Sequence, residues 1–554
     1  MRTTCAFLTT LLASASLSPA AAQQAGDQAR LAEIARQAAQ QFAVARVDAE
    51  QTRPTVPITA PGPSVELTLV EAEARALERN LDLAVERLNP QLQDLQLERL
   101  HATYRPTVSG TFSQRNQVQP PTSQLNGGLI VENNQGAYNT GLTQAVPWGG
   151  GDFSVNFTNQ RQETNNSFSN FNPSYNSNLT ASYTQPLLRD FRIDSTRQQI
   201  RVSTINREVS DIQLRRTITT TVANVRNSYW ELLFASQAVE VARGSLELAL
   251  KLVDDNRARV EVGTMAPLDV VQAEAEAATR RQTLAQAEAT MQTAEIALKR
   301  LIVNGTEDDL WRAKITAIDR PEFRPEPLDV EAAVRRSLDN RTDVAQARKT
   351  IESNDVTMGY LKNQTLPALD LTANYSAQGV GGTRFERQGL GGSISNIIEG
   401  GYGDAMKAIV GRDYPVWQVQ LNVSYPLGSS AQEAQYARAR VQRNQSVAQL
   451  RALELQVAAE VTNAALQVES SLKRFEAATA ARELSDTRLR AEESRFEVGL
   501  STNFFVVQAQ RDLQTAQNSE LRALLDYRRA LVEYERVQDA PAGGGGGITS
   551  IQGN

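Results

Sequence analysis

The chain has 554 residues, a formal net charge of −6 at pH 7, one histidine and one cysteine. Nucleic acid binds clustered lysine and arginine, so an acidic chain with interspersed charges is a poor partner for it. The sequence contains no catalytic constellation, no phosphate-binding loop and no Cys/His cluster for metal, and we expect neither enzyme activity nor a cofactor.

Residues 1–22 predict a secretory signal peptide. Arg2 precedes an apolar run from Cys5 to Leu17 and a group of alanines ending at Ala22, which is the order of a signal sequence. A membrane anchor is the alternative, but the run is short for a transmembrane helix. Residues 23–66 predict a short amphipathic helix and a proline-rich linker. No later apolar run is long enough to span a membrane as a helix.

The remainder of the chain carries one succession of patterns twice. Residues 69–106 align without a gap with residues 330–367. The RVEVG segment at 259–263 aligns in the same way with RFEVG at 495–499. An internal duplication of this kind indicates one architectural unit that is built twice.

We therefore divide the chain into a first copy at 67–327, a second copy at 328–538 and a tail. Each copy predicts a helix, a region of strands and a pair of long helices. These segments are 69–103, 107–187, 195–260 and 267–303 in the first copy, and 329–363, 368–427, 430–496 and 502–537 in the second. Pro90 should kink the first of these helices. The Gly-rich tail at 539–554 is expected to be disordered.

The long helices show a seven-residue repeat of apolar side chains. In the first copy its members are Ile218, Val225, Leu232, Val239, Leu246 and Val253. This spacing predicts a coiled-coil seam. A helix of about 60 residues would be roughly 90 Å long, which is typical of rods and tubes. Closely spaced alanines in the following helix predict helix axes that approach closely.

The strand regions alternate apolar and polar residues. Trp417, Val419 and Leu421 alternate with glutamines, and other segments of both regions repeat the pattern. In an exported chain this alternation predicts transmembrane strands with an apolar face toward lipid and a polar face toward a lumen. The expected aromatic girdle consists of Trp417, Tyr425, Tyr183 and Tyr375. A half-buried soluble sheet is the alternative; we favour the barrel because the helices already bury their apolar faces against one another.

The chain resembles the TolC-type outer membrane efflux proteins over residues 67–538. The resemblance rests on the LTLVEA segment at 67–72, on Pro106 and Pro367 before the first strands, and on the two Arg-x-x-x-Gly turns. It implies an α+β membrane protein that forms a homotrimer. Each chain would give four strands to one 12-stranded transmembrane β-barrel, and its helices to a coiled-coil periplasmic tunnel. The glycine-rich turn at 147–151 departs from the family pattern and would add either a hairpin or a loop to the first copy.

Two short turns separate the long helices. They consist of Val262, Gly263 and Thr264 after Arg259, and of Val498, Gly499 and Leu500 after Arg495. Glycine is typical of the left-handed residue at a helix end. The resemblance implies that these turns lie at the periplasmic end of the tunnel and dock a periplasmic adaptor, which connects the channel to an inner-membrane pump. Three chains would present six turns to six adaptor subunits.

The resemblance also implies a constriction formed by acidic residues just past each turn. Asp269 fits this position in the first copy. In the second copy the corresponding stretch contains Phe504, Phe505 and Gln508 and no acid. A ring of Asp269 carboxylates would hold multivalent cations and select against anions, with an apolar ring of Phe504 or Phe505 beside it.

The sequence thus predicts a passive exit channel of a tripartite efflux system, in the outer membrane of a Gram-negative cell and in contact with its lipid. It would conduct drugs or metabolites. The exit duct of a type I protein secretion system is an alternative that the sequence does not separate. A structural coiled-coil surface protein without channel activity is an alternative of another class. A diffusion porin is excluded because porins lack long helices.

Overall fold

The computed structural model describes residues 64–120, 130–166, 168–319, 327–389, 392–428 and 430–540. The predicted signal peptide lies outside these residues, as do the predicted N-terminal helix and nearly all of the linker and tail. Residues 64–66 were assigned to the linker but belong to strand β1 (Ser64–Leu67). This strand pairs in parallel with β6 (Lys314–Ala317), which follows the short helix α7 (Asp309–Arg312).

Each copy begins with an interrupted helix instead of the single helix expected. The first copy has α2 (Leu69–Arg79), α3 (Leu81–Glu86), α4 (Leu88–His101) and the 3-10 turn η1 (Ala102–Tyr104), and the second has α8 (Val330–Asn340) and α9 (Thr342–Gln364). The breaks at Asn80 and Arg341 occupy aligned positions of the two copies. The helix is interrupted at Arg87, three residues before Pro90, because proline has no N–H with which to continue the helical hydrogen bonds; this interruption agrees with the predicted kink.

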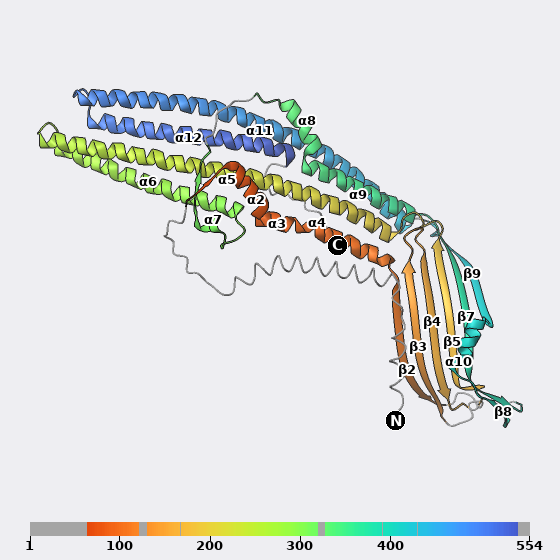
Figure 1. Cartoon of the computed structure of the whole chain (residues 1–554). Helices are drawn as coiled ribbons and strands as arrows, with labels where there is room; N and C mark the ends of the chain where they lie inside the picture. Colours follow the sequence, from red (N-terminus) through yellow and green to blue (C-terminus); the bar gives the residue numbers. More distant parts are fainter. Residues whose placement is uncertain are drawn as a thin grey trace, which may run out of the picture. The chain divides into compact units, whose positions relative to one another are not determined.

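Four long helices lie side by side in two pairs (Figure 1). They are α5 (Ser195–Glu261) with α6 (Pro267–Ile302), and α11 (Ala431–Glu497) with α12 (Asn503–Asp539). Their ends differ from the predicted ends by at most two residues. Val225, Leu232 and Val239 of the predicted seam are buried, so the heptad pattern marks the packed side of α5. Across the described ranges, no helix combines the length and apolar composition that a membrane crossing requires.

The long strands form one antiparallel sheet. Its members are β2 (Thr107–Gln119), β3 (Val131–Ala145), β4 (Asp152–Thr164), β5 (Phe171–Pro186) and β7 (Ala368–Arg387), followed by β9 (Tyr414–Ser424) and the short β8 (Ile394–Ile398), which both pair with β7. The described part of the sheet has six long strands, so the prediction of four strands per chain is wrong. The turn at 147–151 joins β3 to β4, and its Gly149 and Gly150 have φ angles of 73° and 71°.

The register gives the sheet two different faces. One row across all six long strands contains Val108, Leu142, Val155, Ala181, Tyr375 and Trp417; we call this side the apolar face. The neighbouring row contains Thr107, Thr143, Ser154, Ser182, Asn374 and Gln418 and belongs to the polar face. The side chains of Val108 and Trp417 are 72% and 76% exposed. The chain therefore leaves a part of its apolar face uncovered.

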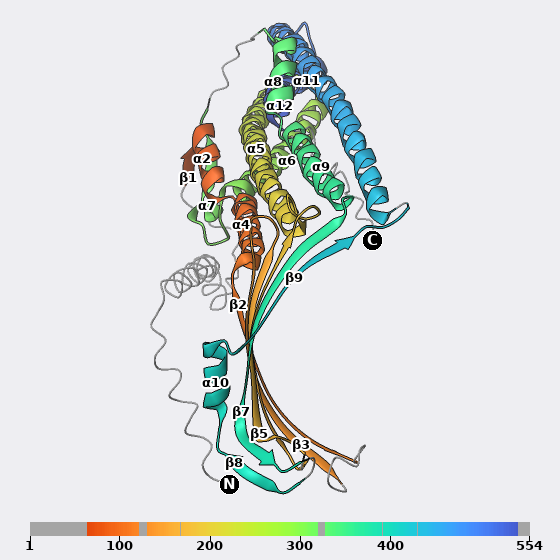
Figure 2. The same cartoon turned by 90° about the vertical axis from the view of Figure 1, so that its right-hand side faces the viewer.

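A helix that the sequence analysis did not predict lies on the apolar face. Helix α10 (Tyr402–Gly411) connects β8 to β9 and packs beside β7 (Figure 2). Two glycines of β7 permit this close approach. A Cβ at Gly379 would lie 2.0 Å from the carbonyl oxygen of Ala405, and a Cβ at Gly381 would lie 2.3 Å from that of Gly401.

Candidate functional site at the turns of the helix pairs

The two helix pairs end in turns of the same geometry. Gly263 and Gly499 have φ angles of 79° and 76°, which other residues adopt only with strain. Each turn is closed by a backbone hydrogen bond that spans five residues, from Thr264 to Arg259 at 2.9 Å and from Leu500 to Arg495 at 2.8 Å. A Cβ at either glycine would meet no atom within 4 Å. The backbone conformation alone therefore demands glycine at both positions.

The turns present apolar side chains to their surroundings. Val262, Val498 and Leu500 are 73%, 69% and 74% exposed. Thr264 is also exposed, and its hydroxyl donates to the carbonyl of Arg259 at 3.0 Å. Val262 and Val498 occupy matching positions, so each turn exposes an apolar side chain at the same place. We call this end of the helix pairs, residues 256–269 and 492–508, the tip.

The two arginines of the tip make different contacts. The Arg259 guanidinium carbon lies 4.3 Å from the centroid of the Phe496 ring, and a terminal nitrogen donates to the Phe496 carbonyl at 3.4 Å. Arg259 thus connects α5 to α11. Arg495 pairs at 3.1 Å with Glu492 of its own helix and is 61% exposed. The hydroxyl of Ser501 donates to Glu492 and, as the largest effect, lowers the pKa of that carboxyl.

Two buried asparagines, which the sequence analysis missed, also connect the helices at the tip. The side-chain amides of Asn256 and Asn503 donate to the carbonyl of Asp269 at 3.5 and 3.4 Å. Their Oδ1 atoms are buried and accept no hydrogen bond from the described residues. Each such acceptor costs roughly 1–3 kcal/mol. The helix ends at the tip are therefore connected by long hydrogen bonds, and some of their buried polar atoms are unsatisfied.

The predicted constriction residues lie in the first turns of α6 and α12 and directly after them. Asp269 is partly exposed. Phe504 and Phe505 are 63% and 51% exposed and pack edge to face, with ring centroids 5.6 Å apart. Gln508 donates to Asp512 at 2.9 Å. Asn503 brings the start of α12 to the backbone of Asp269, so the carboxylate and the aromatic pair belong to neighbouring helix ends.

A buried ion cluster connects α6 to α12 behind the tip. Glu276, which is 5% exposed, pairs with Arg280 at 2.6 Å and accepts hydrogen bonds from Arg511 of α12. Burial raises the pKa of Glu276, but the hydrogen bonds and charges of Arg511 and Arg280 outweigh it and hold that pKa below its usual value. The carboxylate is therefore charged at neutral pH and attracts arginines from both helices.

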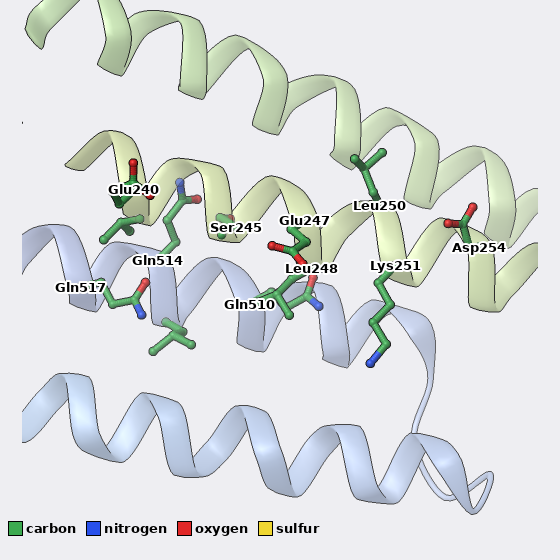
Figure 3. A pocket seen from close by; sticks show the side chains of 13 residues that line it. Glu240, Ser245, Glu247, Leu248, Leu250, Lys251, Asp254, Gln510, Gln514 and Gln517 are labelled. Atoms are coloured by element: carbon green, nitrogen blue, oxygen red, sulfur yellow. The ribbon is translucent and has the colours of Figure 1, made fainter. Parts of the chain in front are cut away.

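A groove with a volume of about 870 Å³ runs between α5 and α12 (Figure 3). Glu240, Glu247 and Asp254 line its α5 side at seven-residue spacing, and Gln510 and Gln514 line its α12 side. Because the carboxylates are two helical turns apart, they do not converge on one point. Throughout the described residues, no three or more His, Cys, Asp or Glu side chains gather where they could hold a metal ion.

Comparisons with known proteins agree with this architecture. The sequence matches the family described as outer membrane efflux protein over residues 152–304 and 333–536. The cobalt-zinc-cadmium resistance protein CzcC of Cupriavidus metallidurans is 28% identical over 156 residues, which cover 28% of this chain and 35% of CzcC. The chain thus spans about a third of the length of this relative.

Solved outer membrane channels have a similar fold. The CmeC channel of Campylobacter jejuni superposes with a TM-score of 0.60 and 14% identity, over 85% of each chain. The outer membrane protein VceC of Vibrio cholerae gives a TM-score of 0.59 and 16% identity, over 85% of this chain and 96% of VceC. At these identities the comparison establishes the fold.

Proposed function

Because the chain belongs to the outer membrane efflux protein family, we propose that it is the outer-membrane exit channel of a tripartite efflux system. It would act as a homotrimer that passively conducts small molecules out of a Gram-negative cell. The observation that carries this proposal is the combination, in one chain, of an uncovered apolar sheet face with two long helix pairs that end in matching turns.

The edges of the sheet support closure into a barrel. Among the described strands, β2 and β9 each pair along one edge only. The two strands run in opposite directions, so β2 of one copy can pair in antiparallel fashion with β9 of the next. A ring of three copies would remove these open edges. Six long strands from each copy make a barrel of eighteen strands instead of twelve, which is wide enough for an aqueous channel.

The faces of the sheet agree with a position in a membrane. The exposed apolar row would face lipid, and the polar face would line the lumen. Within this row Tyr375 and Trp417 are paired, and Tyr183 and Tyr425 lie toward the helix pairs. We assign Tyr375, Trp417 and Tyr425 to the girdle at the lipid boundaries, whereas Tyr183, which pairs with Ala373, lies within the apolar band.

The helices offer surfaces for neighbouring copies. Large apolar side chains are exposed on α6 and α11, namely Leu268, Val271, Ile296, Val441, Leu455, Leu466 and Leu484. Several predicted close-packing alanines of α6 are also exposed, among them Ala275, Ala278, Ala285 and Ala289. In a trimer these surfaces would be buried between chains, so the long helices would form the wall of a periplasmic tunnel.

The six turns of such a trimer would dock a periplasmic adaptor that leads to an inner-membrane pump. The exposed Val262, Val498 and Leu500 supply apolar contacts at both kinds of turn. The pump would provide the energy, and the channel would open when the helix pairs separate at the tip. Because the buried Oδ1 atoms of Asn256 and Asn503 are unsatisfied, separation of the helix pairs costs less free energy.

The test is the conductance of the purified trimer in planar lipid bilayers. We expect a channel with a small single-channel conductance that is closed for most of the recording. Arg259→Ala removes the contact between α5 and α11 and should raise the open probability. Arg495→Ala, at the aligned position, removes only a contact within α11 and serves as the control. If neither the unaltered chain nor Arg259→Ala conducts, the proposal fails and a structural coiled coil is favoured.

A further inference from the structure

The apolar face becomes more polar at its distal end, which is the end away from the helix pairs. Four residues beyond the apolar row, the register places Phe112, Tyr138, Asn159 and Ser177 side by side. Arg161 and Tyr175 follow as the next pair on this face. A polar group of this kind does not suit contact with acyl chains.

A cavity of about 270 Å³ lies at this place, between the strands and α10. Its lining includes Tyr138, Asn159, Arg161, Tyr175, Ser177 and Tyr402. Tyr402 comes from α10, and its ring meets that of Tyr175 edge to face at 6.2 Å. Three tyrosine rings and a few polar groups therefore surround one space, as is usual for small-molecule sites.

Hydrogen bonds hold the lining in place before any ligand arrives. Ser177 and Asn159 are 3% and 9% exposed, and the Ser177 hydroxyl donates to Asn159 Oδ1 at 2.6 Å. Arg161 Nε donates to the Tyr175 hydroxyl at 3.3 Å, and a terminal nitrogen of Arg161 pairs with Glu163. A ligand would not have to order these side chains on binding.

The position of the cavity along the strands indicates which layer of the membrane would surround it. On β7, alternating apolar side chains run from Leu369 to Ala377. Nine residues span about 30 Å of strand, which a tilt of about 40° reduces to roughly 23 Å, close to the height of the lipid-facing band of a barrel. The cavity begins beside Gly379, directly beyond this band. With the helices in the periplasm, this position is the headgroup level of the outer leaflet.

We propose that this cavity binds the phosphorylated sugar headgroup of an outer-leaflet glycolipid, beneath α10 as a roof. The inference rests on the proposed outer-membrane barrel. The tyrosine rings offer flat surfaces and hydroxyls to a sugar. The Arg161 guanidinium keeps N–H donors beyond those that Tyr175 and Glu163 accept, and such donors can bind a phosphate. Because Glu163 pairs with the same guanidinium, we expect reversible binding. The bound lipid would fix the depth of the channel in the outer leaflet.

The experiment measures the lipopolysaccharide that is retained by the full-length trimer. The protein is purified from outer membranes, delipidated and mixed with lipopolysaccharide, and bound lipid is counted by native mass spectrometry. Arg161→Gln should lower retention about tenfold, as expected for the loss of a charge-assisted hydrogen bond, and Tyr402→Ala should lower it by removing a ring that lines the cavity. Arg115→Gln, on the polar face of β2, is the matched control and should change nothing.

A second pair of variants tests the roof without touching the lining. A side chain at Gly379 would collide with Ala405 of α10, whereas one at Gly110, on the same face of β2, would meet no atom within 4 Å. Gly379→Val should therefore lose the lipid, and Gly110→Val should keep it, while the bilayer conductance of both variants stays unchanged.

The proposal is overturned if Arg161→Gln and Gly379→Val retain as much lipopolysaccharide as the unaltered chain. It is also overturned if Arg115→Gln loses as much lipid as Arg161→Gln, or if inorganic phosphate or phosphatidylethanolamine binds equally well. Conductance separates this failure from that of the proposed function. A chain that conducts but shows no selective retention disproves only the lipid site.

Discussion

At the break between the initial helices, different residues in the two copies connect the chain to the end of a long helix. In the first copy, Asn80 donates to the carbonyl of Leu301 at the end of α6, at 3.0 Å. In the second, Arg341 occupies the aligned position and donates to the carbonyl of Val537 near the end of α12, at 3.3 Å. Leu301 and Val537 are themselves at aligned positions. The connection is kept while its chemistry changes, which shows that the geometry of this junction is the common requirement.

The change in chemistry requires further partners. Asn80 is neutral, and its own Oδ1 accepts from the N–H of Leu83. Arg341 is fully buried and charged, so it is accompanied by Asp343 and Glu460, both at 2.7 Å. A buried charge is tolerated only when it is paired. The second copy therefore depends on an ion cluster where the first depends on an amide.

The largest predicted difference between the copies follows from this contrast. Arg341→Ala removes the buried cation that pairs with Asp343 and Glu460 and should lower the free energy of unfolding by about 3–5 kcal/mol. Asn80→Ala should cost about 1–3 kcal/mol, because it leaves only neutral groups unpaired. Denaturant titration followed by circular dichroism of the helices measures both. Arg335→Ala, at a side chain that is 74% exposed, is the control. Equal losses at Asn80 and Arg341 would contradict the comparison.

The next effect concerns Glu276, whose aligned position in the second copy is Asp512. Glu276→Gln leaves Arg280 and Arg511 without a carboxylate and should destabilise the contact between α6 and α12 by about 2–3 kcal/mol, with a rise in open probability. Asp512→Asn should have a smaller effect, because the Asp512 side chain is 34% exposed. Single-channel recording compares the two variants, and an equal rise in both would contradict the assignment.

The same carboxyl predicts a dependence on acid. The pKa of Glu276 is lower in the folded chain than its usual value of 4.5. Its stabilising contribution is therefore complete above about pH 4.5 and is lost as the pH falls through the lowered pKa. Acidification below pH 4.5 should destabilise the unaltered chain more than Glu276→Gln. Parallel loss of stability in both chains would remove Glu276 from this role.

The sequence was most informative where a pattern was long. The heptads and the Arg-x-x-x-Gly turns located the long helices, because periodic burial extends over many residues. The strand number was wrong, because the family resemblance implied four strands, and the glycine turn at 147–151 was compatible with either an extra hairpin or a loop. Helix α10 was missed because it is short and lies among glycines. The shared hydrogen-bond acceptor of Asn256 and Asn503, the carbonyl of Asp269, could not be predicted, because this requires knowledge of which helices meet.

Because the two turns at the tip have the same geometry, we expect glycine substitutions in them to lower local stability equally in the two copies. Gly263→Ala and Gly499→Ala should each cost about 1–2 kcal/mol of local stability, since both residues are left-handed and both have open space for a Cβ. Hydrogen exchange at the turns measures this loss. Gly244→Ala, within α5 and also in open space, should instead be neutral or stabilising. A clearly larger loss at one of the two turns would mean that their geometries differ in the assembled trimer.

The smallest effects are expected at the predicted constriction, where the two copies carry different residues. Substitutions there can make one copy resemble the other. Asp269 and Phe505 occupy aligned positions. Asp269→Asn should weaken the block of the channel by multivalent cations several-fold, because it removes a ring of three carboxylates. Phe505→Asp should add a second ring and strengthen the block. Phe505→Leu is the control for the loss of the exposed ring. If Asp269→Asn leaves the block unchanged while Phe505→Asp creates a new one, the constriction belongs to the second copy alone, and the carboxylate of the first copy lies outside the conducting path.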